Sequence, residues 1–70
     1  METLKVKIAG MNCNHCKINV ERQLLTIQGI RVAIADLQAG EVTVKGDRID
    51  LGEVRSAVES IGYSFDGKVT

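Results

Sequence analysis

The sequence predicts an α+β fold in which a four-stranded antiparallel sheet carries two helices on one face. Seventy residues are enough for one domain with one small core. Hydrophobic residues alternate along the strand-like segments and recur at helical spacing in two others, in the order βαββαβ. Right-handed crossovers convert this order into a split βαβ sandwich, so we expect residues 1–70 to form a single domain.

The first half of the chain contains a strand and a helix. Leu4, Val6 and Ile8 alternate with lysines over residues 3–8, which predicts a strand with one buried and one solvated face. The next apolar residues recur every three or four positions, so a helix is expected from about residue 14 to residue 28. Its apolar positions are Cys16, Val20, Leu24 and Ile27.

The second half contains three strands and a helix. Residues 30–37 and 41–45 are expected to form a hairpin around a short turn. Asp50 is the predicted cap of the second helix, and Gly62 is its stop. The last strand is expected over residues 63–69. The apolar stripe of the second helix consists of Leu51, Val54, Ala57, Val58 and Ile61.

Composition excludes several classes of function. Nine basic and nine acidic side chains cancel, which leaves no electrostatic footprint for nucleic acid. The N-terminus lacks the apolar segment of a signal peptide, and no apolar run approaches the length of a membrane span. We therefore expect a cytoplasmic protein that does not insert into membranes. The start at Met1 and the end soon after the last strand favour a complete small protein.

The concentrated chemistry of the chain is Cys13-Asn14-His15-Cys16, which contains its only cysteines. A C-x-x-C pair places two sulfurs one helical turn apart, where they can hold one soft metal ion or form a disulfide. Free thiols are expected, because the cytosol keeps lone cysteine pairs reduced. Cys16 would lie in the first helical turn, where the helix dipole favours a thiolate.

Ligand counting narrows what the pair can bind. A structural zinc site needs about four ligands and an iron–sulfur cluster four thiolates, but only His15 accompanies the two cysteines. Covalent haem attachment requires a histidine where Lys17 stands. A thioredoxin-like dithiol remains a rival, although that fold is longer and this chain has no proline. Two soft sulfurs suit Cu(I) best, because Zn(II) would lack ligands.

Three neighbouring residues could assist the site. His15 is either an accessory ligand or an exposed side chain that tunes proton release on binding. Met11 is either a thioether ligand or a buried anchor for the loop. Tyr63 either contacts the thiolates without binding the metal itself or packs its ring in the ordinary way. No nucleophile, base and orienting group come together in the sequence, so we expect no enzyme.

The string from Gly10 to Cys16 resembles the G-M-x-C-x-x-C motif of heavy-metal-associated domains, and is most similar to small bacterial copper chaperones. The resemblance extends over the whole chain. Further matching segments are Val20-Glu21, Gly29-Ile30, Leu37-Gln38-Ala39-Gly40-Glu41-Val42, Ile49, Ala57-Val58 and Gly62-Tyr63. It implies a ferredoxin-like βαββαβ sandwich, and it implies that Tyr63 lies near the metal loop.

The resemblance also implies a function. Cu(I) would be carried between Cys13 and Cys16 and handed to the metal-binding domain of a copper-transporting P-type ATPase or to another thiolate acceptor. Transfer would proceed by ligand exchange through a three-coordinate intermediate. The chain would be a monomer or a metal-bridged dimer. Three alternatives remain: an excised domain of a P-type ATPase, a domain handling Zn(II), Cd(II) or Hg(II), and a thiol–disulfide oxidoreductase.

Some positions depart from the family pattern. Ala33 and Ala35 stand where β-branched residues are common, so we expect these two, together with Leu37, to face inward. Val32 and Ile34 would then lie on the open sheet face, available for self-association. Asn12 brings no carboxylate, which favours copper over zinc. Asn19 replaces a common alanine and has no role that the sequence reveals.

Overall fold

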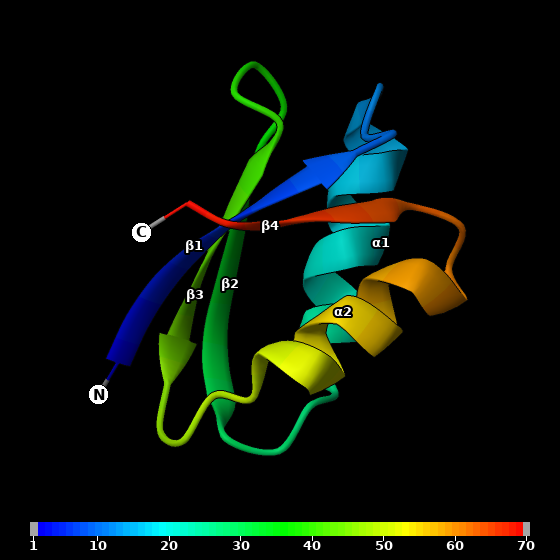
Figure 1. Cartoon of the computed structure of the whole chain (residues 1–70). Helices are drawn as coiled ribbons and strands as arrows, with labels where there is room; N and C mark the ends of the chain where they lie inside the picture. Colours follow the sequence, from blue (N-terminus) through cyan, green and yellow to red (C-terminus); the bar gives the residue numbers. More distant parts are fainter. Residues whose placement is uncertain (1, 70) are drawn as a thin grey trace.

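The computed structural model describes residues 2–69, and the predicted order βαββαβ is confirmed. The elements are β1 (Glu2–Ala9), α1 (Asn14–Leu25), β2 (Ile30–Asp36), β3 (Glu41–Gly46), α2 (Leu51–Ser60) and β4 (Ser64–Lys68). The strands form one sheet in the order β2-β3-β1-β4, and all neighbours are antiparallel. Both helices cover the same face of this sheet, as expected (Figure 1). Neither helix is long and apolar enough to cross a membrane.

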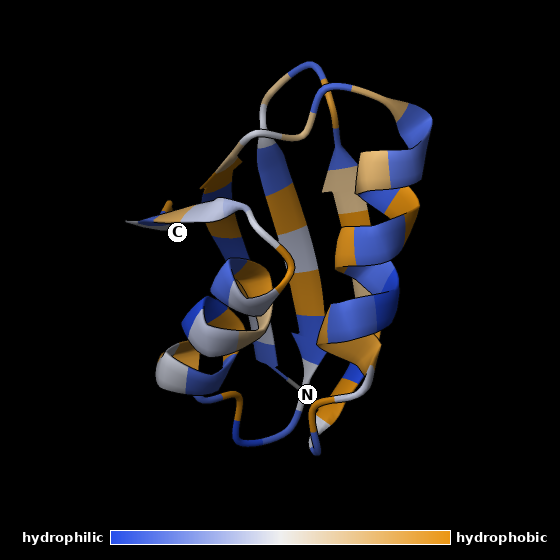
Figure 2. Cartoon of the chain, turned by 90° about the vertical axis from the view of Figure 1, so that its right-hand side faces the viewer, coloured by the Kyte–Doolittle hydropathy of each residue, from blue (hydrophilic) through white to orange (hydrophobic). Residues whose placement is uncertain are grey.

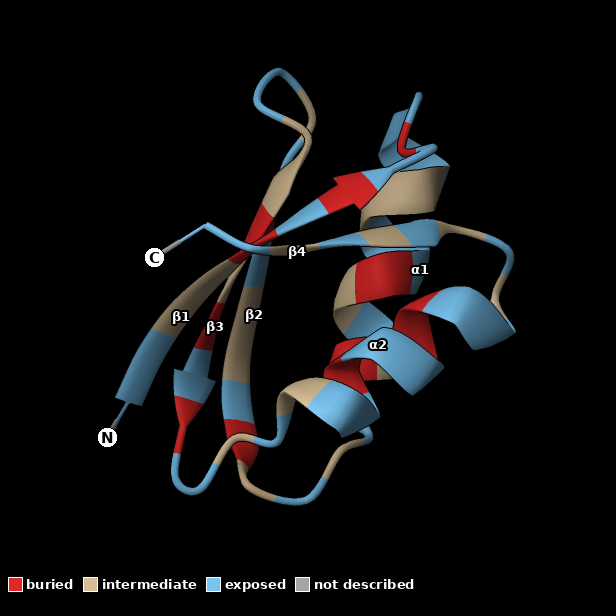
Figure 3. Ribbon diagram, viewed as in Figure 1, coloured by how far each residue is buried: buried red, intermediate tan, exposed pale blue. Residues whose placement is uncertain are grey.

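The core lies between the sheet and the helices. Hydrophobic residues alternate with hydrophilic ones along the strands and form stripes on the helices (Figure 2). The buried residues gather where the two layers face each other (Figure 3). Each fully buried aliphatic side chain contributes about 1.5–3 kcal/mol. The core consists of Val6, Ile8, Met11, Val20, Leu24, Ile30, Ala35, Val42, Val44, Val54, Ala57 and Val58.

A bulge near the start of β2 explains how Ile30 and Ala35, whose positions differ in parity, come to lie on the same face. Ile30 pairs with Gly46 and Val32 with Lys45, so Arg31 is the extra residue. The bulge brings Ile30 and Ala35 onto the same buried face, although their numbers differ in parity. Ile34 faces outward and is 54% exposed. The predicted inward orientation of Ala35 is thereby confirmed.

The first helix and the last strand are shorter than predicted. The first helix ends at Leu25 and not at residue 28, because the amides of Thr26 and Ile27 bond to carbonyls three residues back, which tightens the last turn. Ile27 still packs against the core, which accounts for its place in the helical pattern. The last strand begins at Ser64 because the Tyr63 amide closes α2 by donating to the Val58 carbonyl.

The end of β3 contacts the turn between α1 and β2 at two glycines, Gly46 and Gly29. A Cβ atom on Gly46 would collide with the backbone carbonyl oxygen of Gly29. This carbonyl accepts a hydrogen bond from the Asp47 amide at 2.8 Å. The end of β3 therefore approaches the turn before β2 more closely than any side chain would allow.

Candidate metal centre

The two cysteines lie together at the N-terminal end of α1. Cys13 is the N-cap residue and is exposed, whereas Cys16 lies in the first turn and is half-buried. Both are free thiols, and their Sγ atoms are 3.2 Å apart. The helical spacing predicted from the C-x-x-C motif thus brings both sulfurs to one point on the surface.

The backbone at Cys13 leaves its sulfur available. The residue is extended, with φ −152° and ψ 171°, and its side chain makes no capping hydrogen bond to the helix. The first turn contains no acidic residue. The amides at this helix end and their dipole therefore act on the sulfurs without competition from a capping carboxylate, which favours thiolates.

Hydrogen bonds lower the pKa of Cys16 from 9.0 to about 7. The largest cause is the Tyr63 hydroxyl, followed by the backbone of Asn12 and the Cys13 side chain. Desolvation acts in the opposite direction and is weaker than these bonds together. A substantial fraction of Cys16 is therefore thiolate near neutral pH, the form that binds a soft metal.

Tyr63 reaches the site from the connection between α2 and β4. A Cβ atom at Gly10 would lie 3.0 Å from Cδ1 of the Tyr63 ring, so the glycine makes room for the ring. Gly10 also has φ +102°, a conformation that other residues rarely adopt. The Cys16 thiolate raises the pKa of Tyr63, since the phenol is held as a hydrogen-bond donor to the sulfur.

Asn19 is a member of this network that the sequence did not reveal. Its side chain hydrogen-bonds with the Tyr63 hydroxyl, which acts to lower the pKa of Tyr63. Asn19 stands three residues after Cys16, on the same side of α1, and this spacing was the available signal. The amide can donate to the phenol oxygen while the phenol proton points to Cys16, so the two hydrogen bonds reinforce each other.

Met11 attaches the loop to the core. Its side chain is 6% exposed and belongs to the main hydrophobic cluster. The loop therefore has a buried residue two positions before Cys13. Its packing in the core restricts the position of the loop that carries the exposed sulfur.

His15 has a different environment. It is exposed on α1 and lines an open groove of about 220 Å³ together with Ile18, Asn19 and Arg22. Within residues 2–69, no three His, Cys, Asp or Glu side chains are grouped so that they could hold a metal ion. The accessory role of His15 stays a prediction, and the candidate site consists of the sulfurs of Cys13 and Cys16.

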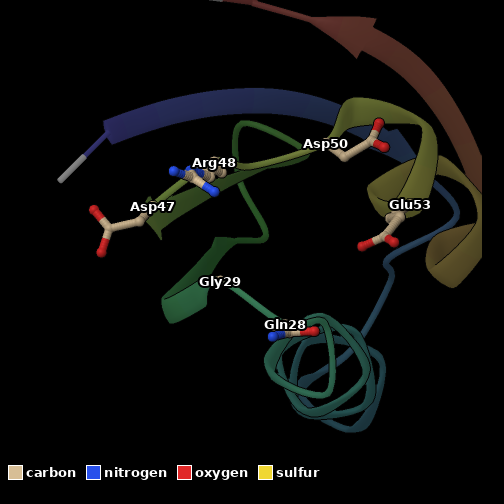
Figure 4. Close-up of a pocket in the computed structure, with 6 residues that line it drawn as sticks. All are labelled: Gln28, Gly29, Asp47, Arg48, Asp50 and Glu53. Atoms are coloured by element: carbon tan, nitrogen blue, oxygen red, sulfur yellow. The ribbon is translucent and has the colours of Figure 1, made fainter.

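A second, more polar pocket lies at the other end of the domain, where α1 ends and α2 begins. It measures about 360 Å³, and its lining residues are drawn in Figure 4. Two of its carboxylates already interact with other groups of the protein. Asp50 caps α2 by accepting a hydrogen bond from the Gly52 amide at 2.8 Å, and Oδ2 of Asp47 lies 3.7 Å from Nε of Arg31. The lining residues are Gln28, Gly29, Asp47, Arg48, Asp50 and Glu53.

Comparison with protein families and curated relatives agrees with this geometry. Residues 5–64 match the family described as the heavy-metal-associated domain. The chain is 35% identical over 65 residues to the copper chaperone CopZ of Staphylococcus saprophyticus. The match covers 90% of this chain and 96% of the relative.

Solved structures give the same picture. A CopZ metallochaperone superposes with a TM-score of 0.87 at 32% identity, over 91% of this chain and 98% of the other. The N-terminal domain of a potential copper-translocating P-type ATPase from Bacillus subtilis, solved in the Cu(I)-loaded state, has a TM-score of 0.85 at 27% identity. This match covers 96% of the present chain and 89% of the other.

Proposed function

The chain belongs to the heavy-metal-associated domain family, and we propose that it is a copper chaperone that carries Cu(I) between Cys13 and Cys16. The observation that supports this most directly is the pair of free sulfurs 3.2 Å apart at the start of α1. The similarity to a curated copper chaperone over nearly the whole chain supports the same assignment.

The number of ligands favours Cu(I) as the cargo. Soft thiolates select Cu(I), and two of them suffice for this ion, whereas Zn(II) in proteins takes about four ligands. The sulfurs are closer together than twice the ~2.3 Å of a typical metal–sulfur bond. An ion on the line between them therefore requires the sulfurs to separate. Cys13 is the one placed to move, because it is exposed and outside the helix.

The different exposure of the two cysteines suggests how the ion would be released. An incoming thiolate from an acceptor would bind Cu(I) as a third ligand, and one of the two cysteines would then leave. Cys13 is the more accessible sulfur, while hydrogen bonds from Tyr63 and the Asn12 backbone stabilise the Cys16 thiolate. We propose the metal-binding domain of a copper-transporting P-type ATPase, or another thiolate acceptor, as recipient. The carrier would act in the cytoplasm and catalyse no reaction of its own.

A second candidate is a regulatory metal-binding domain of a P-type ATPase. The similarity to the N-terminal ATPase domain of Bacillus subtilis favours it, since both kinds of protein share this fold. The reading frame of the gene beyond Thr70 distinguishes the two. A continuous frame into membrane-spanning segments would replace the chaperone with the ATPase domain.

The central experiment is an anaerobic Cu(I) titration against a strong chelator, with Cys13→Ser and Cys16→Ser. Each substitution removes one of two ligands, so we expect 1:1 binding by the parent chain and a loss of affinity of at least about a hundredfold in either variant. Unchanged affinity in both variants would contradict the proposal. Tighter binding of Zn(II), or turnover in an insulin-reduction assay, would support the rival functions.

The matched control is His15→Ala, which changes a residue between the two cysteines without removing a sulfur. Its Cu K-edge absorption spectrum is compared with that of the parent chain. Identical spectra would exclude His15 from the coordination shell, and altered spectra would make it an accessory ligand. Sedimentation with and without Cu(I) separates a monomer from a metal-bridged dimer.

A further inference from the structure

The free edge of β2 is held by a side chain from α1. Because β2 is an end strand, some of its backbone groups point away from the sheet. The Ala35 amide is one of them, and it donates to Oε2 of Glu21 at 2.8 Å. The bond spans two elements and is partly buried. The carboxylate thus takes the position that a carbonyl of another strand would occupy.

The register of the sheet identifies the other outward-pointing groups. Ala33, Ile34 and Ala35 pair in unbroken succession with Val44, Thr43 and Val42. Hydrogen bonding to a neighbour alternates along an antiparallel strand. Since the Ala35 amide points outward, the Ala33 backbone also points outward, and Ile34 bonds to β3.

These outward groups are arranged so that two copies of the edge fit each other. If two β2 strands pair antiparallel about Ile34, then Ala33 of each copy faces Ala35 of the other, and each such pair can exchange both backbone hydrogen bonds. The two Ile34 side chains then meet on the open face. This residue is 54% exposed in the single chain, so pairing would bury apolar surface that is otherwise in water.

We propose that the free edge of β2 is a self-pairing surface for a second copy of this chain, and that Glu21 acts as a latch that keeps it closed. The latch is the hydrogen bond from the Ala35 amide to the Glu21 carboxylate. It occupies the Ala35 donor, next to the centre of the paired register, and leaves a charged group at the edge, where a second copy would bring another. Such pairing would be symmetric and would not involve the metal loop.

Sedimentation of three variants tests the proposal. All carry Cys13→Ser and Cys16→Ser, so neither metal nor disulfide can bridge two chains, and failure of the copper proposal would leave the result unaffected. Glu21→Ala opens the latch, and we expect a concentration-dependent dimer. Glu21→Gln keeps a side-chain oxygen of the same shape and should stay monomeric. Glu21→Ala with Ala35→Pro removes the edge donor while the ring points away from β3, and should be monomeric again.

A folded Glu21→Ala that stays monomeric would overturn the proposal, as would a dimer that persists with Ala35→Pro. Hydrogen exchange provides a readout that needs no destabilised variant. In the parent chain the Ala35 amide should exchange at least about tenfold more slowly than the Ala33 amide, because it bonds to a charged acceptor. Equal rates at the two positions would show that no latch exists.

Discussion

At the scale of single residues, the two cysteines are chemically different although the motif is symmetric. Cys16 has a pKa of about 7 because Tyr63, the Asn12 backbone and Cys13 stabilise its thiolate. Cys13 is exposed at the helix cap. In the proposed carrier, Cys16 would therefore hold the ion and Cys13 would release it.

This difference predicts the pH dependence of thiol reactivity. Cys16 carries the proton below its pKa and reacts as thiolate above it. In Cys13→Ser the serine hydroxyl can still donate a hydrogen bond to Cys16, so the alkylation rate should rise mainly below pH 8 and not near pH 9. Adding Tyr63→Phe removes the largest cause of the lowered pKa, and the midpoint should move upward. Iodoacetamide labelling between pH 5 and 10 measures both profiles.

The control for this prediction is Phe65→Leu, since Phe65 packs against the core in the strand that follows Tyr63 and is not among the groups that act on Cys16. Its profile should match that of Cys13→Ser. A Tyr63→Phe profile with an unchanged midpoint would mean that the phenol does not act on the thiolate.

At the scale of elements, the turn after α1 and the end of β3 depend on a close approach of backbone to backbone as much as on side-chain packing. Gly46 ends β3 against the Gly29 carbonyl, where a methyl group would collide with backbone. Backbone cannot rotate aside as a flexible side chain can. The glycine is therefore required at this crossing.

We expect Gly46→Ala to lower the free energy of unfolding by about 2–3 kcal/mol, because the overpacked turn must shift. Urea denaturation followed by circular dichroism measures the loss. Gly52→Ala is the matched control: its Cβ would meet the flexible Asp50 side chain, and alanine is the better helix former. Its effect should stay within about 1 kcal/mol. Equal losses in the two variants would contradict the role given to the Gly29 carbonyl.

At the scale of the whole molecule, the core and the loop between β1 and α1 are one packing unit. Met11 belongs to the same buried cluster as residues at the far end of the helices. A domain of this size is expected to have a free energy of unfolding of about 4–10 kcal/mol, so each core side chain is a large part of it.

This continuity predicts different outcomes for two core truncations. Met11→Ala and Leu24→Ala should each lower the free energy of unfolding by about 2–5 kcal/mol. Only Met11→Ala should also weaken Cu(I) retention against a chelator, because it frees the loop, whereas Leu24 lies near the opposite end of α1. The chelator assay is run at a temperature where both variants are folded. Equal copper affinities would mean that Met11 does not order the loop.

The sequence determined the order of the strands and helices and the placement of the two cysteines one helical turn apart. Alternation along β1 and β3 and the spacing along α1 and α2 are local signals, because each residue's face follows from its own position in a strand or helix. The C-x-x-C spacing is local in the same sense: once Cys16 is helical, Cys13 lies one turn away. These features could be predicted correctly without knowledge of the fold.

The tertiary structure decided what depends on residues distant in sequence. The bulge at Arg31 brings Ile30 onto the same buried face as Ala35, and it arises from the pairing of β2 with β3. The lowered pKa of Cys16 comes mainly from Tyr63, which lies far away in sequence. Asn19 interacts with Tyr63 because the α2–β4 connection lies beside α1. Glu21 likewise reaches β2 across a gap of fourteen residues. Hydrogen bonds and close contacts act over a few ångströms, so only the folded chain determines which of these groups meet.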